Sequence, residues 1–100
     1  MQHKLNLIIT NEAYSDIDRI ASFIALDNPK AASDVVQMLF KACDNLARFP
    51  QMGSHPSCIK NEHVRTFVIK GKFIIAYRID NDKLVVFKIS NHYQNIYHLL

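Results

Sequence analysis

The chain is 100 residues long, with 49% hydrophobic residues, 21% charged residues, 2 glycines and 3 prolines. This length fits a single domain, residues 1–100, and the composition excludes a disordered or low-complexity protein. The net charge of +3 is uneven, because residues 1–50 carry five Lys/Arg against six Asp/Glu and residues 51–100 carry seven against three. A basic half favours an acidic partner, either nucleic acid or an acidic protein segment.

The cysteines and histidines do not follow a metal-binding or redox spacing. Cys43 falls in a helical pattern and Cys58 in a loop, so we expect two reduced thiols, no metal and no cofactor. The first residues lack the apolar block of a secretory signal, and no apolar stretch approaches the roughly 20 residues that a membrane helix needs. We expect a cytoplasmic protein with no membrane partner.

The first half of the chain predicts one strand and two helices. Residues 4–9, KLNLII, alternate and then become apolar, which is typical of a short strand. A helix with Thr10 as its N-cap follows, and it must end by Asn28 because Pro29 disfavours helical backbone at the residue before it. Asn28 and Pro29 suit the start of a second helix, which extends to about Arg48. The very short connection predicts an antiparallel helical hairpin.

Each predicted helix has one apolar stripe with steps of three and four residues. The stripe of the first helix comprises Ala13, Ile17, Ile20 and Ile24, and that of the second comprises Ala32, Val35, Leu39, Ala42 and Leu46. Asp16, Asp18 and Arg19 are interpreted as lying off the first stripe. Both stripes need an apolar surface to cover them.

From Val64 the apolar period changes from 3.6 to 2. Three strand-like runs follow, VRTFVIK, KFIIAYRI and KLVVFKI, with Gly71 between the first two and residues 80–82 between the last two. These connections are short enough only for hairpins, so the runs predict an antiparallel three-strand meander. The chain is therefore predicted to have an α+β fold of order β-α-α-β-β-β, with the helical hairpin packed on one face of a small, mostly antiparallel sheet.

The register of the meander decides which side chains share a face. A two-residue turn at Lys70 and Gly71 would place Val64, Val68, Phe73, Ile75, Tyr77 and Ile79 on the face that packs on the helices. The other face would then present Arg65, Phe67, Ile74 and Arg78. That face is too apolar to be merely solvated and too basic to be core, so we predict a binding surface there. The direction of Lys88 depends on the length of the second turn, which the sequence leaves open.

Four features follow one another along the chain: a helix that begins near a threonine, then NPKAA, then LARFPQMG, then VRTFVIKGKFIIAYRIDNDKLVVFKI. Together, from about Leu7 to Asn95, they resemble the RelE/ParE superfamily of bacterial toxins, whose fold is the one predicted above. The long helical hairpin, the NP followed by AA, and the FP followed by Gly53 are more similar to the ParE branch than to the RelE branch.

This resemblance implies the toxic half of a type II toxin–antitoxin pair, held inactive by a cognate antitoxin in a hetero-oligomer. An acidic or amphipathic tail of the antitoxin would cover the apolar and basic sheet face, where arginines can bind carboxylates. ParE-like toxins are associated with binding DNA gyrase and do not act by catalysis, whereas RelE-like toxins cleave messenger RNA in the ribosome. We expect no sequence-specific DNA binding by this chain.

The C-terminal residues depart from the usual ParE-like pattern, which has an arginine, two further residues, a histidine, and one or two arginines. Lys88 takes the first position, Asn91 falls at the histidine position, and His92 and Tyr93 follow. This departure leaves two alternatives to a gyrase-binding toxin. One is a ribosome-dependent nuclease, and the other is a non-toxic member of the superfamily that only binds its antitoxin.

In the nuclease alternative the catalytic candidates are Arg65, Arg78, His92 and Tyr93. The histidine would be the acid or base, the tyrosine would position the phosphate or stack on a base, and the two arginines would hold the phosphate. The residues predicted to bind antitoxin or target are Arg65, Phe67, Ile74, Arg78, Lys88, Asn91, His92 and Tyr93.

Overall fold

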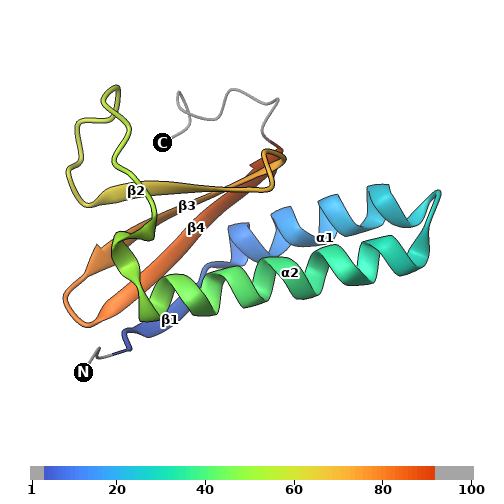
Figure 1. Ribbon diagram of the computed structural model, residues 1–100, viewed down its shortest axis with the longest axis horizontal. Helices are drawn as coiled ribbons and strands as arrows, with labels where there is room; N and C mark the ends of the chain where they lie inside the picture. The colour runs from blue at the N-terminus through green and yellow to red at the C-terminus, as the bar shows by residue number, and fades with distance from the viewer. Residues whose placement is uncertain (1–3, 92–100) are drawn as a thin grey trace.

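A four-stranded mixed sheet carries a helical hairpin on one face in the computed structural model, which describes residues 4–91 (Figure 1). The elements are β1 (Asn6–Ile9), α1 (Asn11–Ala25), α2 (Pro29–Arg48), the short 3₁₀ helix η1 (Pro50–Met52), β2 (Val64–Ile69), β3 (Phe73–Asp80) and β4 (Lys83–Asn91). The strand order is β1-β4-β3-β2, with β1 parallel to β4 and the other neighbours antiparallel. The predicted α+β fold and its order of elements are confirmed.

Both helices begin at the residues that their local sequence predicts. The Thr10 hydroxyl accepts a hydrogen bond from the Ala13 N–H at 3.2 Å, and the Asn28 side chain accepts one from the Ala31 N–H at 3.0 Å. Each such cap stabilises a helix by about 1 kcal/mol. Pro29 follows Asn28 as the first residue of α2, where no helical partner for its nitrogen is needed. Among the described residues, no helix is long and apolar enough to cross a membrane.

The core lies between the helical hairpin and the sheet. Its buried members are Ala13, Ile17 and Ile20 of α1, Leu39, Cys43 and Leu46 of α2, and Ile69, Phe73, Ile75, Tyr77, Leu84, Val86 and Ile89 of the sheet. The two apolar stripes predicted from the sequence therefore meet the same sheet face. Removing this apolar surface from water is the main favourable contribution to folding.

The turn between β2 and β3 contains one residue more than the predicted register allows. Lys70 and Gly71 adopt positive φ values of 52° and 66°, and the Lys72 N–H donates to the Ile69 carbonyl at 2.9 Å, as a two-residue turn requires. Pairing nevertheless begins between Ile69 and Phe73, so Lys72 is an extra residue on the β3 side. This single residue shifts the register of the hairpin by one.

Strand β2 is consequently turned over relative to the prediction, since side chains alternate with a period of two. Arg65 and Phe67 pair with core residues of β3 and face the side of the helices, whereas Val64 and Val68 lie on the opposite side. We call that opposite side of the sheet, which faces away from the helices, the open face, although Val64, Ile74 and Val85 on it are buried. The faces predicted for β3 are correct, so the error is confined to β2.

The course of β4 is altered by a β-bulge. A two-residue turn, residues 81–82, joins β3 to β4, and pairing is regular along residues 83–86. Phe87 then has no partner on β3, and the next pair joins Lys88 to Ala76. An extra residue of this kind bends a strand and increases its twist. The direction of Lys88 is thus set by the bulge as well as by the turn.

Tyr77 ties the segment after α2 to the sheet. Its hydroxyl accepts a hydrogen bond from the Gly53 N–H at 3.0 Å and donates one to the Pro50 carbonyl at 2.6 Å. Burial raises the pKa of Tyr77, and the hydrogen bond from Gly53 and the nearby charge of Arg65 oppose that shift. A Cβ atom on Gly53 would lie 2.5 Å from the Tyr77 hydroxyl oxygen. The proline and glycine of the FPQMG motif therefore have a structural role.

Replacing Tyr77 by phenylalanine should lower the free energy of unfolding by about 1–3 kcal/mol, because the Gly53 N–H and the Pro50 carbonyl lose a buried partner. Gly53→Ala should also destabilise the protein, because the added methyl group has no space. Urea unfolding measures both effects, and Tyr14→Phe, at an exposed ring, is the matched control. Equal unfolding free energies for Tyr77→Phe and Tyr14→Phe would contradict this role.

Candidate binding surface

The structure does not gather the predicted binding residues into one cluster. Six of them lie in the described part of the chain and form three pairs: Arg65 and Phe67 on the helix side of β2, Ile74 and Arg78 on the open face of β3, and Lys88 and Asn91 near the end of β4. His92 and Tyr93 lie outside the described residues. The prediction that both arginines share a face with Phe67 and Ile74 is therefore wrong, and the cause is the extra residue in the β2–β3 turn.

Arg65 binds the main chain of its own protein. Its Nη1 donates a hydrogen bond to the carbonyl oxygen of Gly53, and its side chain is half-buried. Because Gly53 also contacts the Tyr77 hydroxyl, Arg65 belongs to the set of contacts that hold the segment after α2. Phe67, two residues later, packs against the edge of the core. Both residues have local structural partners on the helix side.

Arg78 is the predicted cation that does lie on the open face. Its Cζ atom is 5.9 Å from the centroid of the Phe87 ring, which is within the range of a cation–π attraction. Both side chains are half-buried, and Arg78 forms no ion pair with another residue in the range 4–91. The pair therefore offers a guanidinium and an aromatic ring to a partner. Ile74, on the same face, is 1% exposed and adds little accessible apolar surface.

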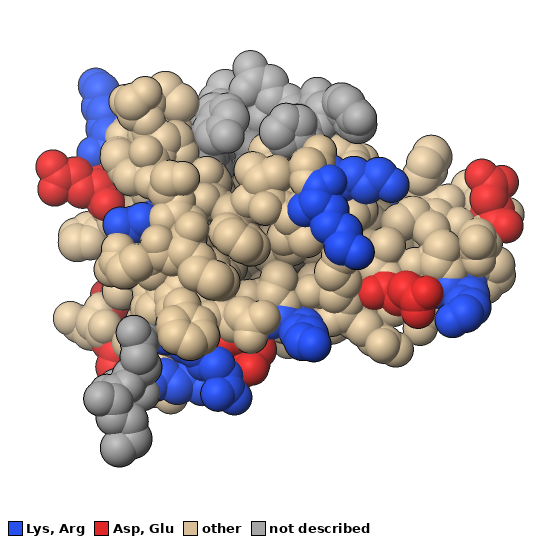
Figure 2. Space-filling model, in the orientation of Figure 1, with Lys and Arg blue, Asp and Glu red and all other residues tan. Residues whose placement is uncertain are grey.

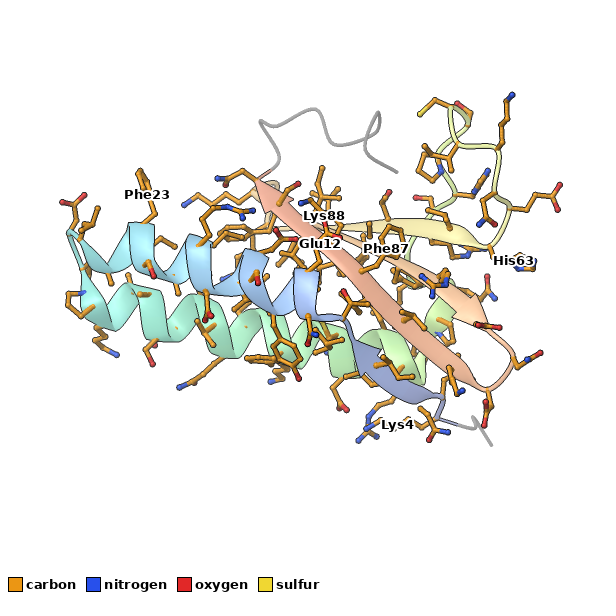
Figure 3. The ribbon with its side chains drawn as sticks, turned by 180° about the vertical axis from the view of Figure 1, so that it is seen from behind. Lys4, Glu12, Phe23, His63, Phe87 and Lys88 are labelled. Atoms are coloured by element: carbon orange, nitrogen blue, oxygen red, sulfur yellow. The ribbon has the colours of Figure 1, made fainter. Side chains whose placement is uncertain are left out.

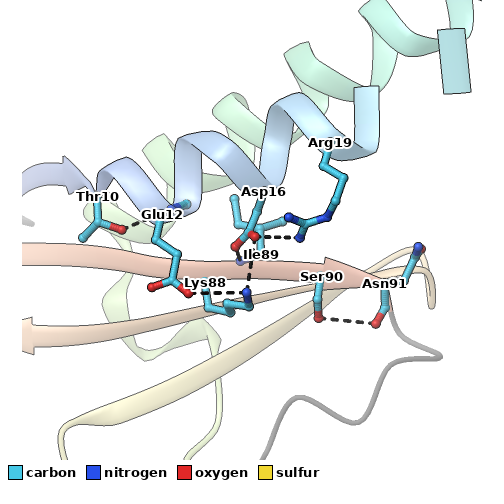
Figure 4. A network of polar contacts seen from close by, with 9 residues as sticks. Thr10, Glu12, Asp16, Arg19, Lys88, Ile89, Ser90 and Asn91 are labelled. Atoms are coloured by element: carbon cyan, nitrogen blue, oxygen red, sulfur yellow. Dashed lines mark hydrogen bonds and ion pairs between the residues drawn. The ribbon is translucent and has the colours of Figure 1, made fainter. Parts of the chain in front are cut away.

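Lys88 points to α1 and contacts two carboxylates there (Figure 4). Its Nζ lies 3.3 Å from Oδ1 of Asp16 and 3.5 Å from Oε1 of Glu12, and its side chain is only 16% exposed. Asp16 is 1% exposed, and its Oδ1 is also 2.7 Å from Nη2 of Arg19. Its Oδ2 accepts a hydrogen bond of 3.0 Å from the Ile89 N–H. The Lys88 ammonium group thus forms ion pairs within its own chain.

Beyond the end of β1, the Asp16 carboxylate supplies the hydrogen-bond acceptor that a neighbouring strand would otherwise give to β4. Strand β1 ends at Ile9, and the Thr10 N–H still donates to the Val86 carbonyl at 3.0 Å. Beyond that point α1 lies beside β4, and Asp16 supplies the acceptor that the Ile89 N–H needs. In Figure 3 Glu12 and Lys88 lie close together where α1 crosses β4.

Asp16 is the polar residue that the sequence interpretation missed. The interpretation of Asp16 as lying off the apolar stripe of the first helix is wrong, because the side chain is buried. The signal that identifies it is its position, because Ala13, Asp16, Ile17 and Ile20 follow the i, i+3, i+4, i+7 spacing of a buried face and are all buried. A carboxylate in such a stripe needs cations or N–H donors, and Asp16 has two cations, Lys88 and Arg19, and the Ile89 N–H.

Asn91 ends β4 beside a concave surface. Together with Arg19 and Lys72 it lines a cavity of about 330 Å³ between α1 and the start of β3. Its amide can both donate and accept hydrogen bonds, and the two neighbouring side chains are cations. Asn91 is thus a predicted binding residue that lines a cavity. Its amide and the two cations suit a partner that carries carboxylate or amide groups.

The two cysteines have opposite environments. Cys43 is buried in the core, and this burial raises its pKa from 9.0 to about 12, whereas Cys58 is exposed. The Cys43 thiol is therefore protonated at neutral pH and weakly nucleophilic. No group of three or more His, Cys, Asp or Glu side chains within residues 4–91 is arranged to hold a metal ion.

Comparison with known proteins gives a family match over most of the chain. The family described as "ParE toxin of type II toxin-antitoxin system, parDE" matches residues 7–96. The Sinorhizobium fredii (strain NBRC 101917 / NGR234) protein named "Putative toxin Y4kP" is 35% identical over 86 residues, which cover 85% of this chain and 86% of that protein.

Two solved structures have a similar fold. A chain of the chromosomal ParDE toxin–antitoxin system from P. aeruginosa superposes with a TM-score of 0.72 at 22% identity, covering 89% of this chain and 97% of that one. A chain of the RelBE2 toxin–antitoxin complex from Mycobacterium tuberculosis gives a TM-score of 0.61 at 17% identity, covering 91% and 97%. At these identities the likeness is one of fold.

Replacing Asp16 by asparagine should lower the free energy of unfolding by about 2–4 kcal/mol, because Lys88 would lose its buried anion. Asp18→Asn, at an exposed position two residues further along α1, is the matched control and should change stability little. Lys88→Met should cost less in the Asp16→Asn protein than in the wild type, since the two side chains form one interaction. If urea unfolding showed that Asp16→Asn and Asp18→Asn lower the free energy of unfolding equally, a role of Asp16 in holding Lys88 and β4 would be ruled out.

A thiol reagent at pH 8 should modify one cysteine in the native protein and two in the unfolded protein. The raised pKa and burial of Cys43 keep its thiolate scarce, whereas Cys58 is accessible. The Cys58→Ser variant should therefore not react until it unfolds. Rapid modification of two thiols in the native wild type would contradict the burial of Cys43.

Proposed function

This chain belongs to the ParE toxin family of type II toxin–antitoxin systems, and we propose that it arrests growth by binding DNA gyrase and is neutralised by a cognate antitoxin. Toxins of such systems form complexes with their antitoxins, so an antitoxin partner follows from the family. The finer assignment to gyrase is supported by the ParE branch of the match and by the arrangement of the cations. Such a target also implies that the protein acts in the cytoplasm.

The observation that carries this proposal is the separation of the two arginines. Cleavage of RNA needs a base, an acid and a cation that stabilises the charged phosphorane, all within reach of one phosphate. Arg65 and Arg78 lie on opposite faces of the sheet, and Arg65 already donates to the Gly53 carbonyl. Lys88 is held by Asp16. Among residues 4–91, Arg65 and Lys88 are engaged by internal partners, and Arg78 lies on the other side of the sheet from Arg65. No two of these cations can therefore hold one phosphate together, which favours binding over catalysis.

Arg78 and Phe87 form the part of the open face best suited to a protein target. A guanidinium over an aromatic ring combines a bidentate donor with a rigid apolar surface, and both features are common at energetically important interface positions. Because the Arg78 guanidinium forms no ion pair with another residue in the range 4–91, a partner's carboxylate can pair with it without displacing an internal anion. We propose that this pair contributes to the gyrase contact.

Purified protein free of antitoxin should inhibit the supercoiling of relaxed plasmid by gyrase or trap gyrase on cleaved DNA. Arg78→Ala should weaken this effect by about tenfold, the loss typical of an arginine at an interface. Lys83→Ala, which removes an exposed cation from the other hairpin turn, is the matched control and should leave inhibition unchanged.

Two other results would replace the proposal. If gyrase is unaffected but messenger RNA is cut in translating ribosomes, the chain is a nuclease and the gyrase assignment fails. If expression in the absence of the antitoxin does not slow growth, the chain is a non-toxic antitoxin-binding protein. Inhibition of gyrase that Arg78→Ala does not reduce would retain the target but remove the open face as its contact.

A further inference from the structure

The two inner strands of the sheet are buried on both faces. Strand β3 begins with five consecutive buried residues, 73–77, and β4 has buried residues on both sides of its bulge. A strand with one face in solvent alternates between buried and exposed residues, whereas a continuous apolar run is typical of a strand covered on both faces. The helical hairpin covers only one face of this sheet (Figure 1). The open face of β3 and β4 must therefore have a second cover.

The buried residues of the open face follow the cross-strand pairs. Val68, Ile74 and Ser90 form one row across β2, β3 and β4, because Ile74 pairs with both of the others. Their exposed fractions are 40%, 1% and 1%, for Val68 as for Ile74 and Ser90 in that order. In the next row Ala76 of β3, which pairs with Lys88, is 0% exposed. The cover thus lies over β3 and β4 and leaves the edge strand β2 partly open.

Within the part of the chain that the structure describes, no helix or strand packs on this row of the open face. The segment between η1 and β2 contacts β2 toward its start, where Ser54 pairs with Thr66 and His55 Nδ1 lies 2.8 Å from the Val64 carbonyl oxygen. In Figure 1 this segment lies at the end of the sheet opposite the β2–β3 turn, whereas Ile74 is the second residue of β3, beside that turn. The row is buried within a single chain, so the cover belongs to the same chain.

We propose that the C-terminal segment, residues 92–100, folds back over the open face and covers Ile74, Ala76 and Ser90. The segment lies outside the described residues, but β4 ends at Asn91, next to Ser90 in the buried row. Its sequence, HYQNIYHLL, has five aliphatic or aromatic residues among nine and contains neither Lys, Arg, Asp nor Glu. Burying such side chains against a neutral, apolar sheet face is favourable for both surfaces.

The length of the segment is sufficient for this cover. Nine extended residues span at most about 30 Å, and reversing the chain after β4 takes about three of them, which leaves about 20 Å. The distance along β3 from Ile74 to Arg78 is about 13 Å, because four residues each add about 3.3 Å. Residues 1–3 are too few to serve instead, and they precede β1, which pairs with β4 from Lys83 onward, at the opposite end of that strand from the buried row.

The charge of the covered row also favours an uncharged occupant. Lys88, which pairs with Ala76, is the cation nearest to the row along β4, and its ammonium group is already paired with Asp16. Figure 2 shows Lys and Arg side chains in small separate groups and not as one continuous basic patch, which nucleic acid or a strongly acidic protein would need. Whatever the target of this protein, a partner on this side would meet the Arg78–Phe87 pair beside the segment instead of the covered row.

Thiol accessibility in full-length protein tests this inference, in a Cys58→Ser background that removes the exposed native thiol. The thiol of Ala76→Cys should react at least about tenfold more slowly than that of Val68→Cys, which lies on the same face at a partly exposed position. A tail variant that keeps the length of the chain should remove this protection and accelerate the reaction of Ala76→Cys at least about tenfold. The tail variant carries four substitutions: Ile96→Ser, Tyr97→Ser, Leu99→Ser and Leu100→Ser.

The matched control is Ala47→Cys, at a position of α2 that is also 0% exposed but lies on the helix side. Its thiol should stay protected with either tail, which shows that the four serines leave the chain folded. If Ala76→Cys stays equally protected in the folded tail variant, the segment is not the cover. If Ala76→Cys reacts as fast as Val68→Cys with the native tail, the row has no cover, and protection that is lost on dilution would identify a second copy; each of these results overturns the inference.

A measurement on the wild type keeps the inference testable if the tail variant unfolds. With the methyl groups of isoleucine labelled, the δ1 methyl of Ile74 should show nuclear Overhauser contacts to protons of residues 92–100. The δ1 methyl of Ile75, which faces the helices, should show none and is the matched control. The absence of such contacts at Ile74 would overturn the inference whatever the behaviour of the variants.

Discussion

The buried carboxylate of Asp16 is the contact on which the arrangement of α1 and β4 depends. It accepts a hydrogen bond from the Ile89 N–H and lies within ion-pair distance of Lys88 and Arg19. A carboxylate with 1% exposure is costly to bury unless it is matched by donors and cations, and here it has both. Because it binds main chain on one side and cations on the other, it fixes both the position of the strand and the direction of Lys88.

Local structure was predictable from the sequence because its causes are local. The caps at Thr10 and Asn28 were found at the expected places, and so were the period change near Val64 and the turn at Lys70 and Gly71. The apolar stripes also identified the core, since burial of two helices on one sheet leaves few alternative packings. These features depend on neighbours within a few residues, which a single sequence displays directly.

The candidate site was less predictable because it depends on register. One extra residue, Lys72, turned β2 over and moved Arg65 away from Arg78, and one more, Phe87, changed the course of β4. Both extra residues look like ordinary strand residues in the sequence, and each shifts side chains between faces with a period of two. The separation of the arginines became visible only from the pairing of the strands, and it supports the proposal of binding over catalysis.

Hydrogen exchange at the Ile89 amide most directly tests whether Asp16 holds this framework together. The N–H points to a side chain instead of a neighbouring strand, so its protection reports on that contact alone. In the wild type it should exchange about as slowly as the amide of Ile75 in the inner strand β3, and Asp16→Asn should accelerate exchange at Ile89 far more than at Ile75. An Ile89 amide that exchanges rapidly in the wild type, or equally slowly in both proteins, would contradict the account.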